Sequence, residues 1–504
     1  MTYILLKDRG LLHLNQISVN YFYFLDLKLV QFRYFCTFAT DKSNIQLMTL
    51  VIITIILIGY FLIATEKFTN VNKAAVAIFV GTLGWILYIC YGSDFVMGQH
   101  AKDYASFLDG APASSAAVKQ YIFQNLFLKY VGRASEIVLF LLSTMTIVEI
   151  LQNNGCFDFI SQMLRTRSGK RMLWTLSAIT FLISANLDNL TATVMMLTIM
   201  HAIVSRQRQR VIFGCAIVLS ANCGGALTVI GDPTGLVLWN IGAVTATNYS
   251  LTMALPCLIA WLFPILWLQR GLPRRIETEW ITMPYRGDDT NLNLWQRALM
   301  LFVGIGGLWF IPTFHNITKL SPFLGAMCVL SLLWIVNELM NRKLMNADQM
   351  IQRRVPRVLQ YGVIQMILFV LGIMLALGVV RETGFLNRVD AFMGGIADNM
   401  LVVGFATQIV GSVLDNFATL MSMVSLHDVA ETGSNLALYG QNGAYWKIVA
   451  YAAAMGGNIL CIGSMSGLAL MKMERIKLNW YFVNVGWVSF VASIAGMVCL
   501  WLLV

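Results

Sequence analysis

The chain has 504 residues, of which 58% are hydrophobic and only 12% are charged. An ordinary soluble domain carries about 25% charged residues, so the composition excludes that class and indicates a protein that crosses a membrane many times. The formal net charge of +10 indicates basic cytoplasmic loops beside a lipid bilayer, and we expect no nucleic-acid partner.

The first 47 residues contain several charges and no full apolar span. Two interpretations of residues 1–47 stay open: a native extension, and a start codon assigned too far upstream. We recognise no cleavable signal or transit peptide before the first span.

The rest of the chain is rich in apolar segments that approach or exceed the roughly 20 residues needed to cross a bilayer. Together they predict an all-α polytopic membrane protein with about 10 spanning helices. The candidate spans are 48–64, 73–92, 135–151, 211–250, 251–269, 295–312, 320–340, 359–380, 444–471 and 478–504.

A polar interruption lies in the apolar stretch "SANLDNLTATVMML" at 184–197, which contains Asp188 and Asn189. The flanking segments "RTRSGKR" at 165–171 and "RQRQR" at 206–210 are both basic. Because basic loops face the cytoplasm, both ends of this stretch belong on the same side of the membrane. We therefore predict a re-entrant hairpin over 172–204 with Asp188 and Asn189 at its tip.

A second copy of this pattern, "GSVLDNFATLMSM" at 411–423, contains Asp415 and Asn416. Its flanks carry no basic excess, which is typical of the outer side. The basic clusters at 270–275, 342–343, 353–357 and 472–477 agree with a second hairpin, over 399–427, that enters from the opposite face.

A glycine-rich interruption follows each hairpin, "GGALTVIGDPTG" at 224–235 and "GGNILCIGSMSG" at 456–467, with the same glycine spacing. Hairpins and broken helices repeated in opposite orientation are typical of transporters with inverted repeats. The alternative, that the glycines only allow close helix packing, stays open. The predicted units are a first half over 48–269 with its broken helix at 211–250, a linker with two spanning helices over 270–358, and an inverted second half over 359–504 with its broken helix at 444–471.

The polar residues of these interruptions predict a buried ion site. A carboxylate at the bilayer centre costs at least about 3 kcal/mol, so it is a functional candidate by default. Carboxylate, amide and hydroxyl oxygens suit a hard cation, and a buried carboxylate can hold either a proton or a cation. The hairpin tips contain no Lys or Arg, so we expect their carboxylates to have no basic partner. The alternative, that these Asp side chains pair with basic residues and only stabilise the fold, stays open. The candidates are Asp188, Asn189, Thr191, Thr193, Asp232, Asp415, Asn416, Thr419 and Ser464, the last at the place that corresponds to Asp232.

Two further ionisable residues have weaker signals. Glu136 begins the span 135–151 and is a candidate for lining a water path. His201 lies on the return arm of the first hairpin and is a candidate pH sensor, with a satisfied histidine at the membrane interface as the alternative.

The motifs "SANLDNLTATVMM", "ANCGGALTVIGDPTG" and "SVLDNFATLMSM" resemble those of the NhaD-type sodium/proton antiporters, a family of the ion transporter superfamily, and the resemblance covers residues 48–504. It implies exchange of cytoplasmic Na+ or Li+ for external H+. It also implies that the ion and proton are bound by Asp188, Asn189, Asp232, Thr234, Asp415 and Asn416, with Na+ on Asp188 and Asp415. The implied supporting residues are Ser184, Thr191, Glu136, Ser412, Asn458 and Ser464.

One position departs from this resemblance. Gly411 stands four residues before Asp415, where Ser184 stands before Asp188 and where the family tends to carry Ser in both halves. Either Ser412 substitutes for the missing hydroxyl, or the second half lacks it.

We therefore expect a secondary transporter of Na+, Li+ and H+ without a cofactor, located in a bacterial inner membrane, with a homodimer as an open possibility for its assembly. The alternative is an anion carrier of the same superfamily, for arsenite, a dicarboxylate or a related ion, with or without cation coupling. We do not expect an enzyme, because the five dispersed histidines form no HExxH motif.

Overall fold

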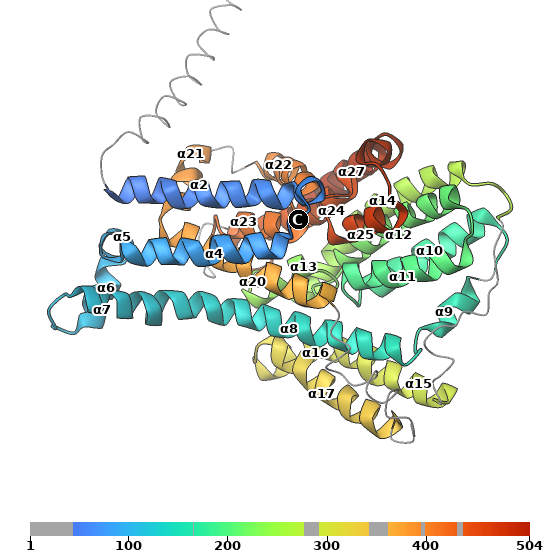
Figure 1. Ribbon diagram of the computed structural model, residues 1–504, viewed down its shortest axis with the longest axis horizontal. Helices are drawn as coiled ribbons and strands as arrows, with labels where there is room; N and C mark the ends of the chain where they lie inside the picture. Colours follow the sequence, from blue (N-terminus) through green and yellow to red (C-terminus); the bar gives the residue numbers. More distant parts are fainter. Residues whose placement is uncertain (1–43, 165, 277–291, 342–360, 395–398, 431–436) are drawn as a thin grey trace, which may run out of the picture.

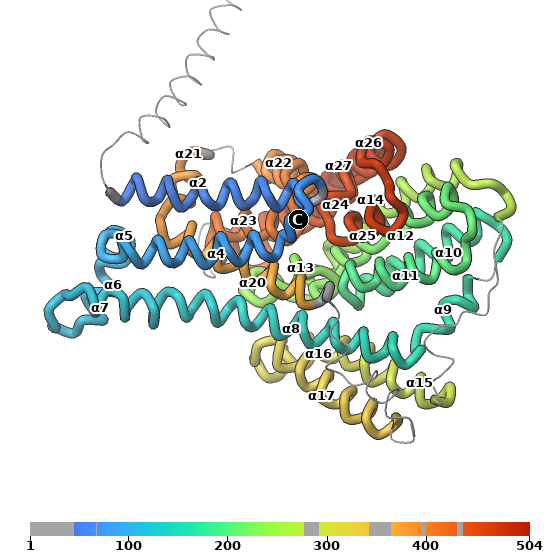
Figure 2. Tube along the Cα trace, in the orientation of Figure 1, coloured from blue at the N-terminus to red at the C-terminus, as the bar shows by residue number. Residues whose placement is uncertain are grey.

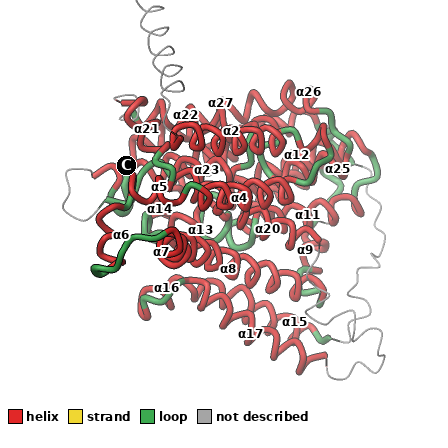
Figure 3. Tube along the Cα trace, turned by 60° about the vertical axis from the view of Figure 1, so that its left-hand side comes forward, coloured by secondary structure: helices red, strands yellow, loops and turns green. Residues whose placement is uncertain are grey.

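The computed structural model describes residues 44–164, 166–276, 292–341, 361–394, 399–430 and 437–504. Every regular element in this described part is a helix, as Figure 3 shows, which confirms the predicted all-α class. Residues 1–43 of the predicted extension and the basic clusters at 342–343 and 353–357 lie outside the described residues.

Nine helical segments of the described residues are long and apolar enough to cross a membrane, which confirms a polytopic membrane protein. The prediction of about 10 spans included 211–250 as a glycine-broken helix. The structure has this break, which separates α12 (Gln207–Gly225) from α13 (Pro233–Asn240). The intervening residues 226–232 are not helical. Helix α13 has only 8 residues, and α12 has 19 but begins with the polar run QRQR, so neither is among the nine.

The helices before residue 276 are α2 (Asn44–Ala64), α3 (Glu66–Thr69), α4 (Lys73–Cys90), α5 (Gly92–Gln99), α6 (Ala101–Leu108), α7 (Ser115–Tyr121), α8 (Leu128–Asn153), α9 (Asp158–Met163), α10 (Gly169–Ser184), α11 (Asn189–Ile203), α12, α13 and α14 (Ala246–Leu268). A π-helical turn over Ile122–Phe127 joins α7 to α8. The result is one continuous helical segment of 39 residues over Ser115–Asn153.

The helices after residue 292 are α15 (Leu294–Leu301), α16 (Gly307–Thr318), α17 (Pro322–Met340), α20 (Tyr361–Glu382), α21 (Phe385–Met393), α22 (Met400–Val413), α23 (Asn416–Val424), α24 (Ala444–Leu460), α25 (Met465–Glu474), α26 (Leu478–Tyr481) and α27 (Trp487–Leu503). Further π-helical turns lie at Phe302–Gly306 and Phe482–Gly486.

The two interrupted hairpins lie in opposite parts of the molecule (Figure 1). Helices α10 and α11 occupy the right-hand part of the view, whereas α22 and α23 lie to the left of α24 and α25. Each hairpin packs against an interrupted helix, α10 against α12 and α22 against α24. The interruptions of both hairpins and of both broken helices therefore lie in the interior, between the two ends of the helix bundle (Figure 2).

The two ends of the bundle differ in the segments that meet there. At the end we call the basic end, Ser168 forms a β-bridge with Arg275, and Arg210 pairs with Glu474. At the opposite end, which we call the vestibule end, α5 to α7 and α21 gather (Figure 1).

Helices α4 and α20 approach each other with their backbones in contact, because both carry glycine at the crossing. A Cβ atom at Gly372 would lie 2.5 Å from the backbone of Ala77 and Ile78, and one at Gly81 would lie 2.8 Å from the carbonyl oxygen of Gly372. This close crossing holds the start of α4 beside the centre of the molecule.

Replacing Gly372 by alanine should destabilise the protein by about 1–3 kcal/mol, because the added Cβ meets backbone that cannot give way. The matched control is Gly132→Ala in α8, where a Cβ meets nothing within 4 Å and alanine favours the helix. We expect the Tm of the purified protein to fall for Gly372→Ala and to stay level or rise for Gly132→Ala. Equal Tm values for both variants would contradict the close crossing.

Candidate functional site

Four helices begin at the interruptions, and a polar side chain caps each of them. The capping residues are Asp188, Asp232, Asp415 and Ser464, which accept hydrogen bonds from the backbone N–H groups of Thr191 (3.1 Å), Thr234 (3.0 Å), Phe417 (3.0 Å) and Gly467 (3.1 Å), respectively. Asp and Ser are preferred at this position because their oxygens satisfy N–H groups that have no partner inside the helix. The polar residues in the apolar core thus have a first, local function as helix caps.

These caps also explain how the carboxylates are tolerated there. The start of a helix carries a partial positive charge, which stabilises an anion placed next to it. Asp188, Asp232 and Asp415 are all buried, and each lies at such a helix start. The interior therefore concentrates fixed negative charge where the backbone favours it.

Asp232 joins the two hairpin tips. Its Oδ2 accepts a hydrogen bond from Asn189 Nδ2 at 3.1 Å and another from Asn416 Nδ2 at 2.8 Å. Asn189 belongs to the first hairpin and Asn416 to the second, so residues far apart in the sequence meet at one carboxylate oxygen. With the backbone N–H of Thr234 on its Oδ1, Asp232 is engaged on both oxygens.

Asp415 has a basic partner that sequence analysis missed. Lys73 Nζ lies 2.6 Å from Asp415 Oδ2, and both side chains are buried. The expectation that the tip carboxylates lack a basic partner is therefore wrong for Asp415. The lysine comes from the start of α4, outside both tips, and its ammonium also lies 4.6 Å from the ring centroid of Phe369. The available signal was a lysine at the first residue of the predicted span 73–92.

Asp188 lies in a different environment. Its Oδ2 accepts hydrogen bonds from the backbone N–H and the hydroxyl of Thr191, at 3.1 and 3.2 Å. Its Oδ1 is buried and has no hydrogen-bond partner within the described part of the chain. Asp188 is thus the carboxylate of the three with a vacant acceptor oxygen.

Further buried oxygens of these elements are unsatisfied. Thr193 Oγ1, Asn222 Oδ1 and Thr419 Oγ1 have no hydrogen-bond partner among the described residues. Such groups are rare in folded proteins and call for a ligand, water or ion. Carboxylate, amide and hydroxyl oxygens together are the donor set that a hard cation such as Na+ prefers, so the residues present fit an alkali cation.

The two interrupted helices contact each other through amides. Asn222 Nδ2 of α12 donates to Asn458 Oδ1 at 2.9 Å and to Ser464 Oγ at 3.1 Å. Asn458 and Ser464 were expected to support the site, whereas Asn222 was not singled out, although it lies within the motif "ANCGG". Asn222 ties the first interrupted helix to the second.

The difference between Ser184 and Gly411 concerns helix packing. Ser184 Oγ donates to the carbonyl oxygen of Ala221 at 2.6 Å. At Gly411, an added Cβ would lie 3.0 Å from the carbonyl oxygen of Ala453, which stands at the position corresponding to Ala221. Ser412 donates instead to Ile409 in its own helix. The first half therefore has an interhelical hydrogen bond where the second half has direct backbone contact.

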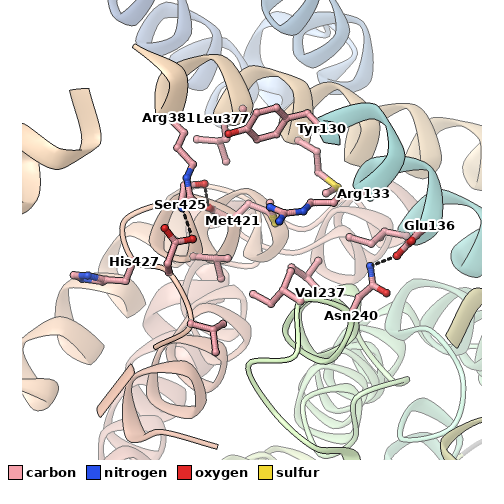
Figure 4. Close-up of a pocket in the computed structure, with 17 residues that line it drawn as sticks. Tyr130, Arg133, Glu136, Val237, Asn240, Leu377, Arg381, Met421, Ser425 and His427 are labelled. Atoms are coloured by element: carbon pink, nitrogen blue, oxygen red, sulfur yellow. Dashed lines mark hydrogen bonds and ion pairs between the residues drawn. The ribbon is translucent and has the colours of Figure 1, made fainter. Parts of the chain in front are cut away.

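A cavity of about 480 Å³ opens at the vestibule end, and we call it the vestibule (Figure 4). Glu136 lines it and accepts hydrogen bonds from Asn240 Nδ2 at 2.9 Å and Ser321 Oγ at 3.1 Å. Val237 of α13 and Met421 of α23 also line this cavity. Because α13 and α23 start at Asp232 and Asp415, the vestibule reaches the two helices that lead to the buried carboxylates. That Glu136 lines a water path stays a prediction.

His201 lies at the basic end, remote from the hairpin tips. Its Nδ1 is 3.0 Å from Glu474 Oε1, which also accepts a hydrogen bond from Arg210 Nε at 3.0 Å. The ring is half exposed, whereas the carboxylate of Glu474 is buried. A structural contact thus accounts for His201, and its role as a pH sensor stays a prediction.

At the vestibule end, His100 links α5 to α20. Its Nε2 lies 2.6 Å from Glu382 Oε2, and the Tyr130 hydroxyl donates to Glu382 Oε1 at 2.6 Å. The hydrogen bond with the Glu382 carboxylate raises the pKa of His100 above its ordinary value, and Asp103 contributes in the same direction against burial and Lys129. Because Tyr130 lines the vestibule, its hydrogen bond with Glu382 fixes one residue of the cavity wall.

Comparisons with known proteins identify relatives that match most of the chain. A family model described as "Citrate transporter" matches residues 60–456. The chain is 28% identical to sodium/proton antiporter 1 of Arabidopsis thaliana, with 87% of this chain and 70% of the relative covered. It is 25% identical to sodium/proton antiporter 2 of the same plant, with 87% and 96% covered. It is 24% identical to the Na+/H+ antiporter NhaD of Vibrio cholerae, with 83% and 84% covered.

Removing Lys73 should destabilise the protein strongly, because Asp415 would be left as an unpaired buried charge. We expect Lys73→Met to cost about 3–5 kcal/mol, and Lys73→Met combined with Asp415→Asn to recover most of this loss. Lys447 is the matched control, since it is also buried and forms no ion pair within 4.0 Å in the described residues. If Lys73→Met and Lys447→Met lower the Tm equally, and the double variant recovers nothing, the ion pair has no energetic role.

The contact between His100 and Glu382 should be pH-dependent. Because the folded-state pKa of His100 is raised, the contact stabilises the fold fully below the ordinary histidine pKa of about 6.5 and is lost as the pH rises through the raised value. His100→Gln should therefore lower the Tm more at pH 6 than at pH 9, on the order of the loss of one charged hydrogen bond. In a Glu382→Gln background this pH dependence should vanish, and its persistence there would refute the assignment.

Proposed function

The chain belongs to the citrate transporter family and, within the ion transporter superfamily, to the NhaD-type sodium/proton antiporters, and from this membership we propose that it exchanges Na+ or Li+ for H+. It is a secondary transporter in a membrane, and the naming of its relatives as antiporters confirms the prediction that it is not an enzyme. The ions moved, their direction and the residues that bind them are our proposal.

One observation carries the proposal: Asp188 has a buried carboxylate oxygen without a hydrogen-bond partner among the described residues. A buried carboxylate is stabilised either by a bound proton or by a bound cation. When Na+ occupies the oxygen, the proton is expelled, and when the proton returns, the cation loses its main anionic ligand. This competition at one carboxylate is sufficient to couple the two ions in opposite directions.

The other two carboxylates have different roles in this proposal. Asp415 is neutralised by Lys73 at 2.6 Å, and Asp232 is occupied by the amides of both hairpins. We therefore propose one exchange site in place of Na+ ligands at both Asp188 and Asp415. Asp188 is the exchange site, Asp415 forms an ion pair with Lys73, and Asp232 holds the two hairpin tips together through hydrogen bonds.

The charge pattern supports a direction. Basic loops face the cytoplasm, and the basic end contains Arg210 and Arg275 beside the entrance to the first hairpin. We propose that the basic end is cytoplasmic and that the vestibule opens to the outside. Na+ or Li+ would leave from the cytoplasm, and H+ would enter through the vestibule past Glu136.

A cation-coupled anion carrier is the second candidate, and one observation favours it. Starts of α11, α13, α23 and α25 meet in the interior, and helix starts are sites where anions bind readily. Against it, three of these four starts are already capped by the carboxylates Asp188, Asp232 and Asp415. A substrate anion would be repelled by these carboxylates, so we favour cation exchange over anion transport as the function.

The exchange requires an energised membrane, and we propose a bacterial inner membrane. The relatives include bacterial and plant proteins. We propose no assembly beyond the single chain, and the homodimer stays a prediction.

The test is to follow a pH-sensitive dye in energised inside-out vesicles. Adding Na+ or Li+ should discharge the proton gradient in the wild type. Asp188→Asn should abolish this response, with a loss of at least about 100-fold in apparent cation affinity, because the amide cannot carry the charge that binds the cation. The control Asp109→Asn makes the same chemical change at an exposed residue and should respond like the wild type.

Two results would contradict the proposal in different ways. A normal Na+ response in a well-expressed Asp188→Asn protein would remove Asp188 from the exchange site. A response to arsenite or a dicarboxylate, with none to any alkali cation, would favour the anion carrier.

A further inference from the structure

We propose that a second cavity, at the basic end, binds the phosphate headgroup of an anionic phospholipid from the adjacent leaflet. This cavity of about 650 Å³ lies where the start of α12, the end of α14 and the turn between α25 and α26 meet. These elements gather in the right-hand part of Figure 2, away from the hairpin tips and from the vestibule. We call it the headgroup pocket.

The rim of the headgroup pocket carries uncompensated positive charge. Arg208, Arg475 and Lys477 line it and are exposed, and none of the three has an acidic partner within 4.0 Å in the described part of the chain. The acidic residue in the lining is Glu474, but its buried carboxylate is already engaged by Arg210. An anionic group of phosphate size would therefore find three cations without displacing an existing ion pair.

The aromatic lining places the pocket at headgroup depth. Trp267 and Trp480 line it and leave 37% and 39% of their surfaces exposed. Exposed tryptophans of membrane proteins collect at the interface between headgroups and acyl chains. Trp267 is fixed in this position because its Nε1 donates to the carbonyl oxygen of Asn484 at 3.1 Å and its ring lies 5.1 Å from the guanidinium of Arg270.

The apolar surface next to the pocket distinguishes a lipid from a free anion. Phe263 and Leu266 of α14 are exposed, and so are Phe482 and Val483 in the π-helical turn after α26. They lie on the same two candidate membrane spans, Ala246–Gly271 and Leu478–Leu503, as the lining tryptophans, where acyl chains of a bound lipid would lie. Basic pockets between membrane helices on the cytoplasmic side are known to bind anionic lipid headgroups, and charge and apolar surface together match such a lipid.

The experiment is native mass spectrometry of the delipidated full-length protein, titrated with phosphatidylglycerol, with phosphatidylcholine, or with inorganic phosphate alone. The wild type should bind phosphatidylglycerol in preference to phosphatidylcholine. The combined variant Arg208→Gln/Arg475→Gln/Lys477→Gln should bind phosphatidylglycerol at least about tenfold more weakly, because each basic residue near the surface contributes to anionic lipid binding. Its weaker binding of phosphatidylcholine should stay unchanged.

The matched control is Lys170→Gln/Arg171→Gln/Arg274→Gln, which removes the same charge from exposed residues of the basic end outside the pocket. An equal loss in both combined variants would overturn the proposal in favour of nonspecific surface charge. Binding of inorganic phosphate as tightly as phosphatidylglycerol, with displacement of the lipid, would overturn the lipid as its occupant. If the combined variant does not fold, Arg475→Gln and Lys477→Gln alone should each weaken lipid binding several-fold, and no change in either would also refute the site.

Discussion

The structure depends on one constraint: helices that begin inside an apolar core must have their first N–H groups satisfied there. Asp188, Asp232, Asp415 and Ser464 meet this need. A carboxylate in this position satisfies the backbone and is itself stabilised by the positive helix start. The buried negative charge is thus stabilised by the same backbone interruption that brings these residues into the interior.

The two halves of the repeat differ in how their carboxylates are paired, although both contain the same Asp–Asn motif. Asp415 has the ammonium of Lys73 as its partner. In the described part of the chain, Asp188 has the Thr191 groups on one oxygen and no hydrogen-bond partner on the other. The second half therefore contains a carboxylate in an ion pair, and the first half contains a carboxylate with a vacant acceptor oxygen. In the function we propose, the open carboxylate couples the two ions, because protonation removes the charge that binds the cation.

The position of Asp232 explains why both halves must stay together. It receives an amide from each hairpin, while Asn222 connects the first interrupted helix to Asn458 and Ser464 of the second. If either hairpin moved, these hydrogen bonds would have to break, or their partners would have to move with it. In a buried region an unsatisfied polar group is costly, so the network favours a small number of discrete arrangements.

The amino-acid sequence by itself determined the all-α membrane class, the interruptions and the acidic pairs Asp188–Asn189 and Asp415–Asn416, because apolar runs, glycine patterns and flanking charges are local signals. Only the tertiary structure decided which groups meet. Lys73 and Asp415 are 342 residues apart, and nothing near either residue in the sequence indicates the other. The same holds for the two amides on Asp232 and for the packing role of Gly411. Such contacts depend on how distant helices are placed against one another, and it is the burial of those helices that gives each contact its energy.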